Sequence, residues 1–354
     1  MGQPKRVRGL RSTCKSNSWT GMATESGGAA PRWLVAPDSF KGTFSAAEVA
    51  AALAEGLRAG GAEADPCPVA DGGEGTLRVL LDALGGTLER APAHDPLGRP
   101  LSGAFGLLAD GRTAVVETAE ASGLGLVAEG ERDPEAASSA GTGELIVSAA
   151  RAGAERILVA VGGSATTDGG MGAVAAIHEA GGIDGVALEV LCDTREPFER
   201  AAVVFGPQKG ADADAVARLT GRLARIATAL PRDPRGVPMG GCAGGLSGGL
   251  WAAFGAQLRP GADAVLDAVG FDACAAAAGR VVTGEGRLDA QSAEGKLVSA
   301  VARRARAAGA GVWAVAGQVR LDAEAVSALG LAGAFEAGTV AELRAAGERL
   351  AQGA

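Results

Sequence analysis

From Trp33 onward, short apolar runs alternate with longer amphipathic stretches, and this alternation restricts the fold more than any other feature of the chain. Buried strands are predicted at 33–36, 156–161, 187–192, 280–283 and 311–316, with another ending near Val69. Most are followed by a loop and a helix, which predicts an α/β fold with parallel strands. Sites in such sheets lie at the carboxyl ends of the strands, so the loops there are where chemistry is expected.

Two local patterns refine this prediction. Residues 86–119 predict three strands in succession, with turns at 96–98 and 110–111. Ser45, followed by Glu48 three residues later, predicts a capping box at the start of a helix over 45–58.

Length and composition fit two domains with closely packed cores. The chain has 354 residues, of which 47% are hydrophobic and only 3% aromatic. The core must therefore consist of Ala, Val and Leu, as suits helices packed on a sheet. The 57 glycines gather at the ends of apolar runs, where they serve tight turns and close approach of the backbone to a ligand.

Charge and cysteine usage exclude several classes of protein. A net charge of -8 argues against nucleic acid as a partner. No uninterrupted apolar stretch is long enough to predict a transmembrane helix. The five cysteines are widely spaced and include no CxxC pair, which predicts no zinc site and is typical of a cytoplasmic location. Residues 1–30 are basic and aperiodic and predict a disordered extension, with Met22 as a candidate start.

Lysine is the most informative residue type. The chain uses 28 Arg and five Lys, and two of the five fall within residues 1–30. The other three, Lys41, Lys209 and Lys296, each adjoin a glycine. Lysine provides a compact point charge where a guanidinium group would not fit, so these positions are candidates for binding phosphate or carboxylate. The alternative is a chance placement in a glycine-rich chain.

Glycine-rich loops follow several strands. Residues 161–170 follow a strand and open a helix, whose N-terminus would favour an anion. Residues 240–249 form a second such segment, and 139–144 a weaker third. A Walker A motif is absent because Ala290 and Leu297 stand at its required positions, and the segment 284–289 fails the Rossmann fingerprint because it ends in Asp289. A standard P-loop kinase or NAD enzyme is therefore disfavoured.

Carboxylates are frequent in the same loops, where each could instead be a helix cap. They are Asp38, Asp71, Glu74, Asp168, Asp193, Glu285 and Asp289. Phosphoryl transfer uses one or two carboxylates to bind Mg²⁺ and often one more to orient or deprotonate the attacking hydroxyl. With only two histidines in the chain, such a base would be Asp or Glu.

A series of motifs resembles the type I glycerate kinase family over about residues 33–320. The motifs are PDSFKGT (37–43), PVADGGEGT (68–76), ETA (117–119), SGL (122–124), GTGELI (141–146), GGSAT (162–166), DGG (168–170), FGPQKGA (205–211), AGGL (243–246), TGEGRLD (283–289) with Gln291, and GK (295–296). Each motif is weak alone, but their order and spacing are highly specific. The chain departs from the family at CDTREPF (192–198), where CDV followed by NPL is usual, at Thr167, where Asn is usual, and at MGGCAGG (239–245).

The resemblance implies a two-domain α/β protein with the active site in the cleft between the domains. A Rossmann-like domain with a parallel sheet would comprise 31–66 plus 275–354, and a second α/β domain would be inserted at 67–274. The implied reaction is transfer of the ATP γ-phosphate to D-glycerate, with Mg²⁺ as cofactor and 2-phosphoglycerate favoured over 3-phosphoglycerate as product. No nucleic acid or membrane partner is expected. The alternatives are a non-catalytic hydroxy-acid sensor, a kinase for a related hydroxy acid, and a sugar-acid dehydrogenase.

The resemblance also assigns candidate roles to residues of this chain. The catalytic candidates are Lys41, Asp193, Asp289 and Lys296, and the metal candidates are Asp193 and Asp289. The candidates for binding substrate or phosphate are Asp38, Ser39, Lys41, Asp71, Glu74, Gly163, Ser164, Lys209, Gly244, Gly245 and Glu285. Lys296 would neutralise charge in the transition state.

Overall fold

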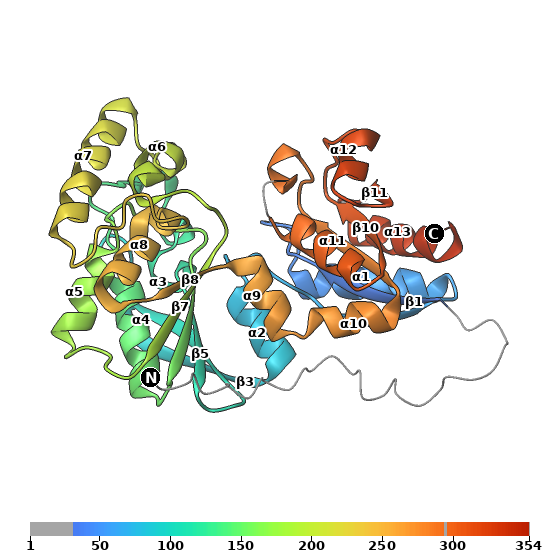
Figure 1. Ribbon diagram of the computed structural model, residues 1–354, viewed down its shortest axis with the longest axis horizontal. Helices are drawn as coiled ribbons and strands as arrows, with labels where there is room; N and C mark the ends of the chain where they lie inside the picture. Colours follow the sequence, from blue (N-terminus) through green and yellow to red (C-terminus); the bar gives the residue numbers. More distant parts are fainter. Residues whose placement is uncertain (1–30, 294–295, 354) are drawn as a thin grey trace, which may run out of the picture.

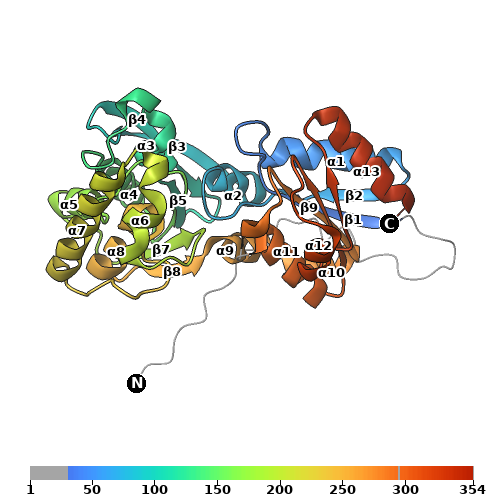
Figure 2. The same ribbon diagram turned by 90° about the horizontal axis from the view of Figure 1, so that it is seen from above.

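Two β-sheets, each with its own helices, organise the part of the chain that the structure describes, residues 31–293 and 296–353. The structure is a computed structural model, shown from two directions in Figures 1 and 2. One sheet carries the N-terminal strand and the C-terminal part of the chain, and the other is formed by the middle of the chain. Helices α2 (Thr76–Leu84) and α9 (Gly261–Ala268) lie between the two sheets.

The first sheet, sheet A, is entirely parallel, with strand order β11-β10-β9-β1-β2. Its strands are β1 (Arg32–Pro37), β2 (Glu63–Pro66), β9 (Arg280–Glu285), β10 (Gly311–Ala316) and β11 (Gly333–Glu336). The chain proceeds from β1 to β2 on one side and from β9 to β11 on the other, so the order reverses between β1 and β9. A reversal of this kind opens a crevice at the carboxyl ends of the two strands, where ligands bind in open α/β sheets.

Helices cover both faces of sheet A because its buried side chains alternate along each strand. Trp33 and Val35 pack on the side of α1 (Ala46–Ala59) and α13 (Val340–Gly353). Leu34 and Ala36 pack on the side of α10 (Phe271–Ala278) and α11 (Leu297–Ala307). A short helix, α12 (Ala323–Ala328), connects β10 to β11.

The second sheet, sheet B, has the order β3-β4-β5-β6-β7-β8. Its strands are β3 (Gly86–His94), β4 (Pro100–Leu108), β5 (Thr113–Glu117), β6 (Arg156–Ala160), β7 (Ala187–Cys192) and β8 (Gln257–Pro260). The pairs β3–β4 and β4–β5 are antiparallel, and β5 to β8 are parallel. The helices of this part are α3 (Ala119–Ser122), α4 (Ala140–Arg151), α5 (Met171–Glu179), α6 (Ala201–Phe205), α7 (Ala213–Ala229) and α8 (Cys242–Phe254).

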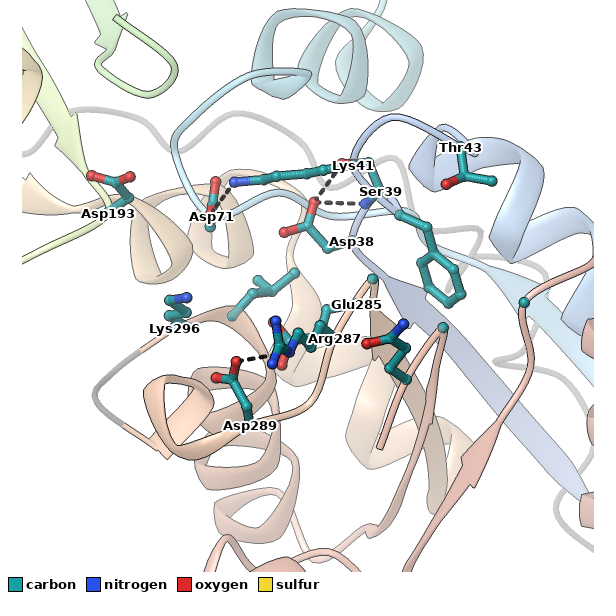
Figure 3. A pocket seen from close by; sticks show the side chains of 16 residues that line it. Asp38, Ser39, Lys41, Thr43, Asp71, Asp193, Glu285, Arg287, Asp289 and Lys296 are labelled. Atoms are coloured by element: carbon teal, nitrogen blue, oxygen red, sulfur yellow. Dashed lines mark hydrogen bonds and ion pairs between the residues drawn. The ribbon is translucent and has the colours of Figure 1, made fainter. Parts of the chain in front are cut away.

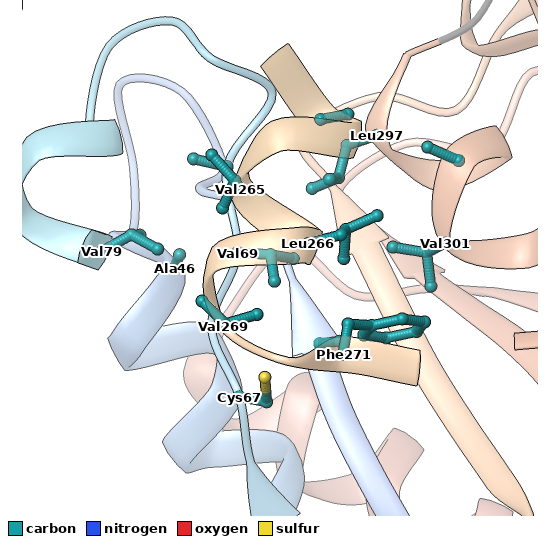
Figure 4. Close-up of a cluster of buried hydrophobic side chains, with 14 of the residues drawn as sticks. Ala46, Cys67, Val69, Val79, Val265, Leu266, Val269, Phe271, Leu297 and Val301 are labelled. Atoms are coloured by element: carbon teal, nitrogen blue, oxygen red, sulfur yellow. The ribbon is translucent and has the colours of Figure 1, made fainter. Parts of the chain in front are cut away.

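One hydrophobic core joins the two sheets. It includes Val281 and Val312 of sheet A and Leu158 and Leu191 of sheet B. Side chains of α2, α9, α10 and α11 fill the space between them, and Figure 4 shows Val265, Leu266, Phe271 and Val301 within this cluster. Because the cluster is continuous, the two sheets are fixed to each other through α2 and α9.

The prediction of two α/β domains is confirmed. The strands at 187–192 and 311–316 have the predicted bounds, 86–117 forms the predicted three strands, and the capping box of Ser45 and Glu48 is present. Strands β8 and β11 were not predicted, and β2 ends at Pro66 rather than near Val69. The domain limits stay a prediction, and the extension at 1–30 lies outside the described residues. No helix among the described residues is both long and apolar enough to cross a membrane.

Candidate functional site

The carboxyl ends of the two sheets border a common cavity of about 610 Å³. From sheet A, loops after β1, β9, β10 and β11 contribute Asp38 to Thr43, Glu285 to Arg287, Gly317 and Gln318, and Gly338. Sheet B contributes Asp193, the residue directly after β7, and the connection from sheet A to sheet B contributes Asp71. The cavity therefore lies at the β1/β9 reversal, where the topology of sheet A predicts a ligand site.

Eight residues predicted for the site line this cavity: Asp38, Ser39, Lys41, Asp71, Asp193, Glu285, Asp289 and Lys296. The other lining residues were not predicted: Phe40, Thr43, Gly286, Arg287, Leu297, Gly317, Gln318 and Gly338. The position of Gly317 and Gln318 could have been found from the sequence, because they follow a correctly predicted strand. Gly338 could not, because β11 before it was missed.

Lys41 and Asp71 form an ion pair across the upper wall of the cavity in Figure 3. The distance from Lys41 Nζ to Asp71 Oδ2 is 3.5 Å. The carboxylate of Asp71, followed by that of Asp38, raises the pKa of Lys41, which keeps the ammonium group charged. The Lys41 side chain is largely exposed to the cavity, whereas that of Asp71 is mostly buried. The exposed ammonium group of Lys41 is thus held at the cavity by the buried carboxylate of Asp71.

Three carboxyl groups around the cavity have raised pKa values. Burial, followed by the charge of Asp71, raises the pKa of Asp38 well above its ordinary value, although the backbone N–H of Ser39 donates to Asp38 Oδ1 at 2.7 Å. Desolvation, followed by the charge of Asp71, raises the pKa of Asp193 to about 6. Its side chain is nevertheless exposed in the cleft. Burial likewise raises the pKa of Glu285. The ionised forms of these carboxyl groups are therefore disfavoured here, and a bound cation would stabilise them.

The opposite wall of the cavity carries positive charge from the segment after β9. Arg287 lies 3.4 Å from Asp289, between Nε and Oδ2. Lys296 is the N-cap residue of α11, and its side chain makes no capping hydrogen bond to this helix. Figure 3 shows Lys296 and Arg287 across the cavity from Lys41. A helix N-terminus beside a lysine is well suited to binding phosphate.

A smaller cavity of about 310 Å³ adjoins the first on the other side of Lys41. It is lined by the loop from Ser39 to Ser45 and by Glu74 and Gly75. Glu74 is thus beside the main cavity and does not line it. Gly163 lies near Glu74, since a Cβ at Gly163 would be 3.5 Å from Glu74 Oε2.

The remaining predicted residues lie within the part of the chain around sheet B and line neither cavity. Lys209 is buried, and its Nζ donates to Ser164 Oγ at 2.9 Å and to the carbonyl oxygen of Thr166 at 2.5 Å. Burial lowers its pKa to about 8. Gly244 packs against the backbone of Thr166, where a Cβ would lie 1.9 Å from the carbonyl oxygen, and Gly245 packs against Phe198. Their roles in binding stay predictions.

Two helix N-termini that follow glycine-rich loops are occupied by carboxylates of the protein. At α5, the backbone N–H groups of Gly170 and Gly172 donate to Asp168, at 3.0 and 3.1 Å. At α2, the N–H groups of Gly75 and Leu77 donate to Glu117, at the end of β5. The anion-binding capacity of these two helices is therefore satisfied internally. Glu117 belongs to the ETA motif (117–119) noted in the sequence, but the sequence assigned it no role.

The residues around the cavity fit a divalent cation that is bound together with a phosphate. Glu285 Oε1 is buried without a hydrogen-bond partner among the residues that the structure describes, and the charges of Asp38, Asp71 and Asp193 oppose one another. Mg²⁺ usually takes only one or two protein carboxylates and completes its shell with phosphate oxygens and water. Among the described residues, no group of three or more His, Cys, Asp or Glu side chains is arranged to hold a metal ion by itself.

Comparison with known proteins gives a consistent picture. The model of the glycerate kinase family matches residues 33–180 and 178–352. Glycerate kinase of Bacillus subtilis (strain 168) is 39% identical over 339 residues, which cover 85% of this chain and 89% of that protein. Glycerate 2-kinase of Escherichia coli (strain K12) is 36% identical, with the same coverage. A crystal structure assigned as glycerate kinase 2 of Salmonella typhimurium LT2 superimposes with a TM-score of 0.76 at 36% identity, covering 92% of this chain and 96% of that one.

Proposed function

This chain belongs to the glycerate kinase family, and from that premise we propose that it transfers the γ-phosphate of ATP to D-glycerate in the cavity between the two sheets. The observation that carries the proposal is the convergence of both sheets on one cavity that holds Lys41, Lys296 and several carboxylates. Catalysis of phosphoryl transfer consists largely of positioning and electrostatic stabilisation, for which such a set of charges is suited. The substrates are small molecules, and we propose a cytoplasmic location.

The two lysines hold the phosphate groups in this proposal. Lys296 and the N-terminus of α11 approach the cavity from below in Figure 3, and Lys41 approaches from above. Charge that develops on the transferred phosphoryl group is stabilised by preorganised cations and N–H groups on both sides. The loops after β10 and β11, with Gly317 and Gly338, form the part of the cavity where the nucleoside is placed.

Asp193 orients the hydroxyl group of D-glycerate and accepts its proton in the proposed reaction. Its pKa of about 6 lies close to neutrality, where a carboxylate is both ionised and basic enough to accept a proton. Asp289 is the proposed Mg²⁺ ligand; Asp193, the other candidate ligand, can act as the base only while it does not coordinate the ion, because coordination removes its basicity. When bound, Mg²⁺ neutralises charge on the phosphate oxygens. A cation beside the polyphosphate would also favour the ionised forms of Asp38 and Glu285, whose pKa values are otherwise raised.

The test of the function is ATP consumption by the purified chain with Mg²⁺ and D-glycerate, with L-glycerate as the control. Turnover with D-glycerate alone supports the proposal, and phosphorus NMR of the product decides between 2-phosphoglycerate, which we propose, and 3-phosphoglycerate. D-glycerate that binds without turnover would instead indicate a hydroxy-acid sensor. Turnover only with another hydroxy acid would indicate a kinase for that acceptor.

A further inference from the structure

The loop that carries Asp71 has little structure of its own. Residues 71–75 form the last part of the connection from β2 to α2, and three of these five residues are glycines. Gly72 and Gly75 both adopt positive φ, at 92° and 94°, which only glycine adopts without strain. Within the loop, the N–H of Gly73 donates to Asp71 Oδ1 at 2.9 Å. Contacts from outside must therefore fix its position.

Sheet B provides these contacts at two strand ends. The N–H of Val161, after β6, donates to the carbonyl oxygen of Gly72 at 3.1 Å. Glu117, the last residue of β5, accepts from the N–H of Gly75 at 2.9 Å with one carboxylate oxygen and from the N–H of Leu77 at 3.1 Å with the other. Gly75 is the N-cap residue of α2 and has no side chain that could cap the helix. Glu117 therefore supplies the cap from a different strand and ties the loop to sheet B at the same time.

A carboxylate is an unfavourable choice for a cap at this place if stability alone is considered. Glu117 is only 5% exposed. Burial, followed by the negative charges of Glu120 and Glu74, raises its pKa to about 7, against the two backbone hydrogen bonds that lower it. Ionised Glu117 thus makes two charge-assisted hydrogen bonds at a cost in free energy. Such a cost is typical of residues that fix the geometry of a functional site.

We propose that Glu117 is a positioning residue for the phosphoryl-transfer reaction. Its carboxylate fixes the end of loop 71–75, and this places Asp71 at the correct distance from Lys41. Glu117 acts only through Asp71 and Lys41, since it does not line the cavity. This inference rests on the proposed function, because Lys41 is the group that contacts phosphate there.

The test compares Glu117→Gln and Glu117→Ala with the control Glu89→Gln. Glu89 is an exposed carboxylate on β3, outside loop 71–75 and outside the cavity, and it is not among the charges that raise the pKa of Glu117. Glutamine keeps one acceptor oxygen, so kcat should fall about tenfold in Glu117→Gln and about hundredfold in Glu117→Ala, since misplacement by about 1 Å costs that much. The melting temperature at neutral pH should fall little in Glu117→Gln, and Glu89→Gln should keep kcat within about twofold.

Hydrogen exchange of the backbone provides a readout that does not depend on turnover. Exchange of the amides in residues 71–77 should be faster in both Glu117 variants and unchanged in Glu89→Gln. Wild-type kcat in Glu117→Ala, or a kcat that falls only in proportion to the folded fraction, would overturn the proposal. If the wild-type chain does not turn over D-glycerate, the proposed function fails. Independently of that result, unchanged exchange in residues 71–77 of the Glu117 variants would overturn the positioning role.

Discussion

Glu117→Gln should remove a pH-dependent loss of stability that the wild-type chain shows between about pH 5 and about pH 8.5. The pKa of Glu117 is raised from 4.5 to about 7 in the folded protein, mainly by burial. The folded state therefore prefers protonated Glu117, and the resulting stabilisation is fully present below about pH 4.5 and is lost as the pH rises through about 7.

The magnitude follows from the two pKa values. A tenfold change in proton affinity corresponds to about 1.4 kcal/mol, so the difference between 4.5 and about 7 corresponds to about 3 kcal/mol. About 2 to 3 kcal/mol of this falls between pH 5 and pH 8.5, because part of the loss already occurs near the lower pKa. The glutamine variant cannot ionise at this position and should not lose this contribution.

The assay is urea unfolding of both proteins at about pH 5 and about pH 8.5. Comparing the change between the two pH values in each protein cancels the contribution of the other titrating groups. The free energy of unfolding of the wild type should fall with pH by about 2 to 3 kcal/mol more than that of the variant. Glu89→Gln, on an exposed part of β3, is the surface control and should retain the wild-type pH dependence. Parallel pH dependence in the wild type and Glu117→Gln would refute the reasoning.

Three further predictions concern the cavity and its surroundings. Lys41→Met should lower kcat at least about hundredfold with a nearly unchanged melting temperature, and undiminished turnover would remove Lys41 from the site. Asp193→Asn should abolish the rise of kcat/KM with pH through about 6, the pKa of Asp193. If the variant's remaining activity still rises over this pH range, a group other than Asp193 causes the rise. Lys209→Met leaves the carbonyl oxygen of Thr166 and the hydroxyl of Ser164 without their buried donor, so it should lower the melting temperature by several degrees while reducing kcat less than Lys41→Met. The reverse pattern would place Lys209 on the substrate.

The sequence was sufficient for most of the fold because long periodic segments and strand–helix alternation carry a strong signal. The two missed strands are short and only partly buried. Gln257–Pro260 has one apolar side chain, Leu258, and lies at the edge of sheet B. Gly333–Glu336 lies at the edge of sheet A and is likewise only half-buried. An edge strand gains its structure from its neighbour's backbone, which no local pattern reveals.

The candidate site was predictable where a charged residue lies at the carboxyl end of a strand. Asp38 and Asp193 directly follow β1 and β7, and Glu285 is the last residue of β9. The sequence could not distinguish a loop that opens into the cavity from one that packs within its own domain. Lys41 lies on a loop of the first kind, whereas Lys209 is buried on a loop of the second kind. It also could not assign the capping role of Glu117, which it noted only as part of the ETA motif, because the backbone groups that Glu117 caps are 42 and 40 residues away in the chain. Local capping motifs are read within a few residues, whereas this one is assembled by the packing of β5 against α2.

The continuous core between the two sheets limits how this architecture can be divided. A fragment that contained only the middle of the chain would expose Leu158 and Leu191 to water, and the part left behind would expose Val281 and Val312. Exposed apolar surface of that kind promotes aggregation. The two halves should therefore not fold when they are separated by genetic recombination or by protein engineering. A new acceptor specificity would have to come from substitutions in the loops around the cavity, because exchanging the sheet B half for that of another protein would disrupt the shared core.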